Sequence, residues 1–103
     1  MEWDFDHVHF LARDVHALSK YFEEVFGMER LAFYEAFKGA PYAILKLGSG
    51  DLRIRGYREG DEPDARGPSL VEGLDHLGLA AEDVEKTVAW LESRGAEILR
   101  PPE

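Results

Sequence analysis

The sequence predicts an α+β fold built from two copies of one module. Three observations support this prediction. The length of 103 residues fits one domain, a ten-residue motif near the N-terminus recurs toward the C-terminus, and apolar residues alternate in some segments but follow helical spacing in others. With 45% hydrophobic and 12% aromatic residues, the chain can bury a core, so we expect a globular rather than a disordered protein.

The repeat joins residues 6–15, DHVHFLARDV, to residues 75–84, DHLGLAAEDV. At this constant offset four pairs are identical: Asp6/Asp75, His7/His76, Asp14/Asp83 and Val15/Val84. The likeness resumes at Gly27 and Gly95, one residue out of step. Identities at matching positions are typical of duplication, so each copy should begin in the same way.

The first copy predicts the order β-α-β-β-β. Residues 7–11 alternate as in a strand with two different faces, and Asp14 can cap a helix that ends near Gly27. The apolar stripe of that helix consists of Val15, Leu18, Phe22 and Val25. Strands are expected at residues 30–37, 42–47 and 51–57, with turns at 39–41 and 48–50.

The second copy repeats only this beginning. A strand is expected at residues 77–81, followed by a helix that Asp83 caps and Gly95 ends. Residues 59–73 are charged and rich in glycine and proline, which indicates a solvated linker, with a short functional lid as the alternative. The first module thus spans residues 1–58, and residues 74–103 form the β-α-β start of the second, all within one domain.

Composition excludes several classes of function. The net charge of −9 argues against nucleic acid or an anionic membrane as a partner, since both require surfaces rich in lysine and arginine. The chain has no cysteine, which excludes disulfides, zinc fingers and thiol nucleophiles. No apolar run is long enough to cross a bilayer, and the N-terminus is unlike a secretory signal, so we expect a cytoplasmic protein.

The two modules resemble the vicinal oxygen chelate superfamily, which includes glyoxalase, extradiol dioxygenases and bleomycin-binding proteins. The stretch DHVHFLARDVHALSKYFEEVFGMERL is similar to its first module, and GLDHLGLAAEDVEKTVAWLESRGAEIL to the start of its second. The resemblance implies a cupped mixed sheet with helices outside and a cavity on the inner face. It also implies a truncated second module, because the chain stops before that module's last two strands. An unpaired sheet edge of this kind favours a homodimer.

The same resemblance implies a metal site. The strand-opening positions of the two modules are His7 and His76, which would bind a divalent Zn, Mn, Ni or Fe ion, although a metal-free protein is the alternative. Where the family often has a glutamate ligand, this chain offers Arg53 or Arg55. A guanidinium cannot bind a cation, so this departure weighs against the metal. Without a metal role, His7 would bond to nearby backbone at the end of its strand.

Strand alternation places further residues in the same cavity. If Val8, Phe10, Leu52 and Ile54 face the helix, the residues that alternate with them face the cavity. The polar residues on that face are then His7, His9, Asp51, Arg53 and Arg55. His9 would line the pocket or support a metal ligand, with His9 as a metal ligand itself as the alternative. The two arginines would form either a solvated face or an anion clamp. Tyr42 belongs either to the core or to the pocket. Asp51 either replaces a metal ligand or pairs with an arginine.

Three functions fit these observations. The first is a metal-dependent lyase, isomerase or dioxygenase that acts on a small, oxygen-rich anionic metabolite. The second is a metal-free protein that sequesters a small acidic ligand, as drug-binding members of the family do. The third is a regulatory domain with a vestigial site. Fold resemblance alone does not decide among them, because function depends on the site.

Overall fold

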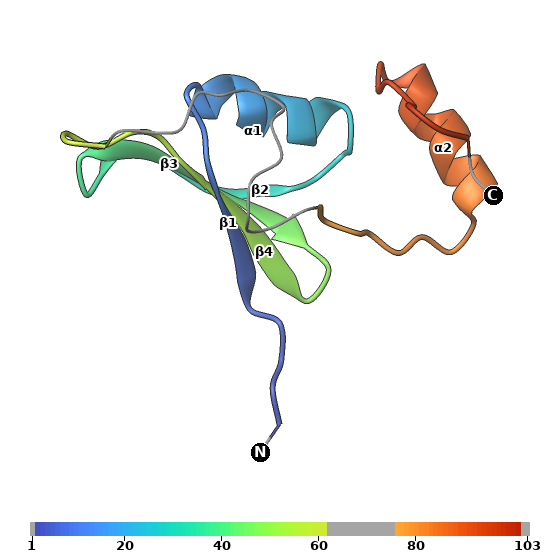
Figure 1. Ribbon diagram of the computed structural model, residues 1–103, viewed down its shortest axis with the longest axis horizontal. Helices are drawn as coiled ribbons and strands as arrows, with labels where there is room; N and C mark the ends of the chain where they lie inside the picture. The colour runs from blue at the N-terminus through green and yellow to red at the C-terminus, as the bar shows by residue number, and fades with distance from the viewer. Residues whose placement is uncertain (1, 62–75, 102–103) are drawn as a thin grey trace. The chain divides into compact units, whose positions relative to one another are not determined.

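The computed structural model describes residues 2–61 and 76–101, and the chain divides into two compact units, of which the first ends at Asp61. The first unit contains β1 (His7–Leu11), α1 (Val15–Glu24), β2 (Arg30–Phe37), β3 (Ala40–Leu47) and β4 (Gly50–Arg55) (Figure 1). The second unit contains α2 (Val84–Ser93). The α+β class and the β-α-β-β-β order of the first copy are therefore confirmed.

The four strands of the first unit form one open, mixed sheet in the order β1-β4-β3-β2. β1 runs parallel to β4, whereas β3 is antiparallel to both β4 and β2. The register places His7 opposite Asp51 and His9 opposite Arg53. The first and last strands of the module thus lie side by side, and their polar residues become neighbours.

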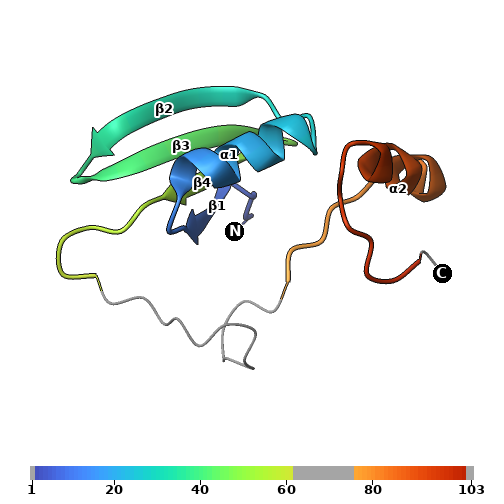
Figure 2. The same ribbon diagram turned by 90° about the horizontal axis from the view of Figure 1, so that it is seen from above.

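α1 covers one face of this sheet and packs over β3 and β4 (Figure 2). The carboxylate of Asp14 accepts a hydrogen bond from the backbone N–H of Ala17 at 3.0 Å, which caps the helix as predicted. Gly27 has a φ of 69°, the left-handed conformation expected just after the helix. Val15 is buried against the sheet, and the predicted stripe residues Leu18 and Phe22 pack beside it.

The core lies between α1 and the sheet. Leu45, Leu52 and Ile54 are fully buried there, and Val8 and Phe10 of β1 pack against them. Burying one such aliphatic side chain contributes about 1.5–3 kcal/mol to the hydrophobic stabilisation. A shift of one residue in any strand would move its apolar side chains to the opposite face, so this packing also fixes the register.

The first hairpin differs from the prediction by a short displacement. The turn between β2 and β3 consists of Lys38 and Gly39, with φ values of 50° and 85°. Two consecutive left-handed residues are typical of the type I′ turn, which matches the twist of paired strands. β3 therefore already begins at Ala40, whereas the sequence placed a turn at 39–41. β4 likewise spans residues 50–55, not 51–57.

In the second unit the helix is confirmed and the strand is not. The carboxylate of Asp83 accepts a hydrogen bond from the N–H of Lys86 at 3.1 Å, and Gly95 follows the helix with a φ of 97°. The strand predicted at residues 77–81 is wrong, because no described segment pairs with it and an isolated strand leaves its backbone groups unpaired. No strand follows α2 up to residue 101 either.

Most of the predicted linker at 59–73 lies outside the described residues, as only residues 59–61 belong to the described part. The division into modules at residues 58 and 74 stays a prediction. Within residues 2–61 and 76–101, neither helix has the length and apolar character needed to cross a membrane.

Candidate functional site

The candidate site is the face of the first unit's sheet that points away from α1, here called the open face. Alternation along the strands and the strand register assign to it the following side chains: His7 and His9 from β1, Tyr42, Ile44 and Lys46 from β3, and Asp51, Arg53 and Arg55 from β4. Six of the seven residues predicted from the sequence therefore share one surface. The seventh, His76, belongs to the second unit, and its role stays a prediction.

A network of charged groups joins the start of β1 to β4. Arg53 donates two hydrogen bonds to one carboxylate oxygen of Asp51, from Nε at 3.0 Å and from Nη2 at 2.9 Å. Of the two explanations left open for Asp51, pairing with an arginine is the one observed. Nη2 also lies 3.9 Å from the carboxylate of Asp6, whose other contact is Nδ1 of His7 at 2.6 Å.

These contacts perturb the titration of two groups. The hydrogen bond with His7 is the largest cause that lowers the pKa of Asp6. Hydrogen bonds to Asp51 and then to the Tyr42 hydroxyl raise the pKa of Arg53 above its ordinary value. Asp6 is thus ionised and Arg53 charged at neutral pH. His7 contacts a carboxylate rather than the backbone group that a structural role at its strand end would require.

His9 is set among aromatic and positively charged neighbours. Its ring meets that of Tyr42 edge-on with the centroids 5.4 Å apart, and Tyr42 in turn packs against Phe37 at 4.8 Å. Tyr42 is only 6% exposed, so it belongs to the packed structure and contacts the site as well. Burial is the main cause that lowers the pKa of His9 below 6.5, and the imidazole is therefore neutral at pH 7.

The chain after β4 folds back as a turn that the sequence did not assign to the site. Nη1 of Arg55 donates to the carboxylate of Asp61 at 2.8 Å, and the same carboxylate oxygen accepts the backbone N–H of Arg58 at 2.9 Å. The N–H of Asp61 donates to the carbonyl of Arg58 at 3.0 Å, and Gly60 between them has a φ of 87°. A left-handed glycine at the third position is the signature of a type II turn.

Arg58 is a candidate site residue that the sequence analysis did not single out. It was placed at the boundary of the predicted linker, where charged residues are expected to be solvated. The segment Arg58-Glu-Gly-Asp61 carries a turn signal, a glycine before an aspartate, which could have indicated that the chain reverses here. Asp61 anchors the turn of Arg58 to Arg55 of the open face, and the charges of Arg55, Arg53 and Arg58 all act on His9.

The described residues do not make up a metal site on their own. Within residues 2–61 and 76–101, no group of three or more histidine and carboxylate side chains is arranged to hold a metal ion. His7 and His9 have ring centroids 6.1 Å apart, and Asp51 is held by Arg53. The first unit thus offers histidine nitrogens, but the third donor expected from β4 is replaced by guanidinium groups.

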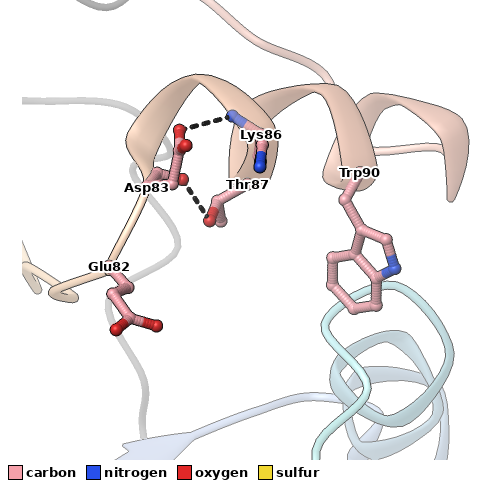
Figure 3. A pocket seen from close by; sticks show the side chains of 5 residues that line it. All are labelled: Glu82, Asp83, Lys86, Thr87 and Trp90. Carbon is pink, nitrogen blue, oxygen red and sulfur yellow. Dashed lines mark hydrogen bonds between the residues drawn. The ribbon is translucent and has the colours of Figure 1, made fainter.

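The second unit carries an open hollow along the N-terminal half of α2 (Figure 3). Its lining residues are Glu82, Asp83, Lys86, Thr87 and Trp90. The polar groups of Asp83 serve the helix itself: its carboxylate caps the helix, and its carbonyl accepts the Thr87 hydroxyl at 2.8 Å. The hollow therefore reflects helix capping, not a constellation of reactive groups.

Comparison with solved structures supports the fold. The chain is 28% identical to a glyoxalase family protein from Enterococcus faecalis, with a TM-score of 0.72, over 91% of this chain and 74% of that one. A glyoxylase/bleomycin resistance protein/dioxygenase domain from Frankia sp. EAN1pec is 24% identical, with a TM-score of 0.68, over 91% and 72% of the two chains.

A more distant similarity is to a mutant of the fosfomycin resistance protein FosX from Listeria monocytogenes, solved with Mn(II) and 1S,2S-dihydroxypropylphosphonic acid. It is 15% identical, with a TM-score of 0.61, over 98% of this chain and 78% of that one. No curated protein matches the chain by sequence.

The repeated Asp-His motif, the β-α-β-β-β order and the mixed sheet with a polar open face all agree with a family model that matches residues 4–103. The chain therefore belongs to the Glyoxalase/Bleomycin resistance protein/Dioxygenase superfamily.

Proposed function

We propose that this chain binds a small, oxygen-rich anionic molecule on the open face of its sheet. The observation that carries the proposal is the concentration of positive charge around His9. Arg53 lies directly opposite His9 in the strand register, Arg55 follows on the same face, and the turn that contains Arg58 is anchored to Arg55 through Asp61. The charges of these three arginines all act on the imidazole of His9, in a chain whose net charge is −9. A local positive potential on an otherwise acidic protein attracts anions selectively.

The surroundings suit a small polar ligand. The neutral imidazole of His9 can donate one N–H and accept at its other nitrogen, while the guanidinium groups donate to carboxylate or phosphate oxygens. Tyr42 and Ile44 add an aromatic ring and an apolar side chain to the same face. Pockets for metabolites commonly combine an apolar lining with a few such polar groups.

Calorimetric titration with inorganic phosphate, oxalate and a neutral diol tests this function. We expect the two anions to bind and the diol not to bind. Ile44→Glu would place a carboxylate opposite Arg53 in the middle of the open face, where it repels anions and occupies the guanidinium. This variant should bind at least about tenfold more weakly, since a lost charged hydrogen bond is worth about 1.5–3 kcal/mol.

The matched control is Ala17→Glu, which adds the same charge on the exposed surface of α1. Anion binding that is equally strong in Ile44→Glu and in the unaltered protein would contradict a site on the open face. Failure of the unaltered protein to bind any of the anions at millimolar concentration would contradict the function itself.

The contact between His7 and Asp6 favours metal-dependent catalysis on an anionic metabolite as a second candidate. Their side chains lie 2.6 Å apart, and histidine ligands of metals are commonly oriented by a carboxylate at the other ring nitrogen. FosX, a member of the same fold, was solved with Mn(II). A complete site would need His76 and further donors besides His7.

Elemental analysis of the purified protein tests the second candidate. About one transition metal per chain, lost in both His7→Ala and His76→Ala, would support it. No metal after incubation with Zn²⁺, Mn²⁺, Ni²⁺ and Fe²⁺ would leave anion binding as the function. The solution mass, measured in parallel, tests the expected homodimer.

A further inference from the structure

The arginines near His9 differ in one respect, namely whether a carboxylate already occupies them. Arg53 directs Nε and Nη2 to Asp51, and Arg55 directs Nη1 to Asp61 and to the carbonyl of Gly56 at 3.1 Å. An ion-paired guanidinium must give up or share its partner before it can bind a ligand. Arg53 and Arg55 are therefore poor candidates for the group that holds an anion.

The guanidinium of Arg58, in contrast, is not paired with a carboxylate of the described residues. Its Nε is buried, and within the part of the chain that the structure describes this donor has no hydrogen-bond partner. No ion pair between its guanidinium and a carboxylate is found among the described residues. A buried donor without an acceptor costs free energy, more so when it belongs to a charged group, and therefore requires an explanation. A ligand oxygen would supply the acceptor.

The turn after β4 holds Arg58 in place through its backbone, and none of the turn's hydrogen bonds uses the guanidinium of Arg58. Asp61 accepts the N–H of Arg58 with one carboxylate oxygen and returns its own N–H to the carbonyl of Arg58. The same oxygen accepts Nη1 of Arg55, so the turn is anchored to the last residue of β4. Gly60 permits the reversal because its φ of 87° is unfavourable for other residues.

We propose that Arg58 is the residue that binds the oxyanion group of the ligand, a carboxylate or phosphate, and that Asp61 is its positioning residue. This inference rests on the function proposed above and assigns the charged end of the ligand to one side chain. Arg53 and Arg55 then keep β4 and the turn in shape, and the remainder of the ligand extends from Arg58 past His9.

The experiment combines titration with inorganic phosphate and NMR detection of arginine side chains. The Nε–H signal that disappears in Arg58→Lys should be the one that moves most on addition of phosphate. Arg58→Gln should weaken phosphate binding at least about tenfold. Arg58→Lys keeps the charge but loses the Nε donor, so it should bind with intermediate affinity. Arg30→Gln is the matched control, because Arg30 contacts Glu23 and Phe33 on the α1 side.

Two variants of Asp61 test whether this residue positions Arg58 or only stabilises the fold. Asp61→Ala releases Arg58 and should weaken phosphate binding, although it also frees Arg55 of its partner. Asp61→Asn keeps an acceptor for the N–H of Arg58 and should restore binding. Stronger binding by Asp61→Ala would instead identify Arg55 as the anchor and overturn the proposal.

The outcomes distinguish this inference from the proposed function. If the unaltered protein binds phosphate and Ile44→Glu does not, the open face is the site. Under those conditions, unchanged affinity in Arg58→Gln overturns the role of Arg58 alone. If the unaltered protein binds no anion, both proposals are wrong.

Discussion

Replacing Leu52 with alanine tests the alternation on which the fold and the site both depend. Leu52 is fully buried in β4, and its neighbour in the sequence, Arg53, lies on the open face. Leucine to alanine removes three carbon atoms, worth about 2.4 kcal/mol at about 0.8 kcal/mol for each buried CH₂ group. The cavity left behind can bring the total to about 5 kcal/mol. Against an expected stability of about 0.05–0.15 kcal/mol per residue, the variant should lose much of its free energy of unfolding.

Urea denaturation followed by circular dichroism measures this loss. Two comparisons define the result: Leu31→Ala, the same chemical change at a leucine that is 51% exposed, and Arg53→Ala on the opposite face. We expect Leu31→Ala to cost no more than about 0.5 kcal/mol. Loss of the partly exposed Arg53–Asp51 pair should cost about 0.2–1 kcal/mol. A smaller effect for Leu52→Ala than for Arg53→Ala would refute the assignment of faces in β4.

Two further predictions concern the two ends of β4. Gly50→Ala should lower the free energy of unfolding by about 1–3 kcal/mol and weaken anion binding, because its Cβ would clash with the carbonyl oxygen of Asp6. The control is Gly78→Ala, whose Cβ would meet no atom and which should leave the thermal unfolding midpoint unchanged. At the other end, the Arg55 hydrogen bond is the main cause that lowers the pKa of Asp61 below its ordinary value of 3.8. Because the folded pKa is the lower one, the turn is stabilised at neutral pH and this contribution is lost as the pH falls below about 3.8. Cleavage by pepsin next to the exposed Tyr57, which directly precedes the turn, should then accelerate as the pH falls through this range, and a pH-independent rate would contradict the role of Asp61.

The faces of β1 and β4 could be predicted because they follow from one property of strands. Successive side chains point to opposite sides, so an apolar residue at every second position assigns the polar residues between them to the other face. Val8 and Phe10 fixed the side of His9, and Leu52 and Ile54 fixed the side of Arg53. The parallel pairing of β1 with β4, which makes these residues neighbours, was not predicted from the sequence, because alternation does not show which strands pair.

Two features lay beyond such reasoning. The strand predicted at 77–81 has the right alternation, but a strand exists only with a partner, and local pattern does not reveal whether one is present. Arg58 was missed because its place depends on a turn closed by a single carboxylate. The composition of the segment predicted a linker. In the structure Gly60 and Asp61 instead form a turn, which brings the chain back toward β4.

The carboxylates around the open face determine which arginine is left to attract an anion. Asp51 and Asp61 each form an ion pair with one arginine of β4, Asp51 with Arg53 and Asp61 with Arg55. With 21 acidic and only 12 basic residues, the chain has enough carboxylates to pair with every arginine. If all arginines of the open face were paired in this way, the face would no longer attract an anion. Arg58 makes no ion pair with a carboxylate among the described residues, because its hydrogen bond to Asp61 comes from the backbone N–H and not from the guanidinium, although the charges of Arg58 and Asp61 still attract each other. An anion should therefore bind where positive charge is left over, and selectivity among anions should depend on how well their oxygens reach both Arg58 and His9.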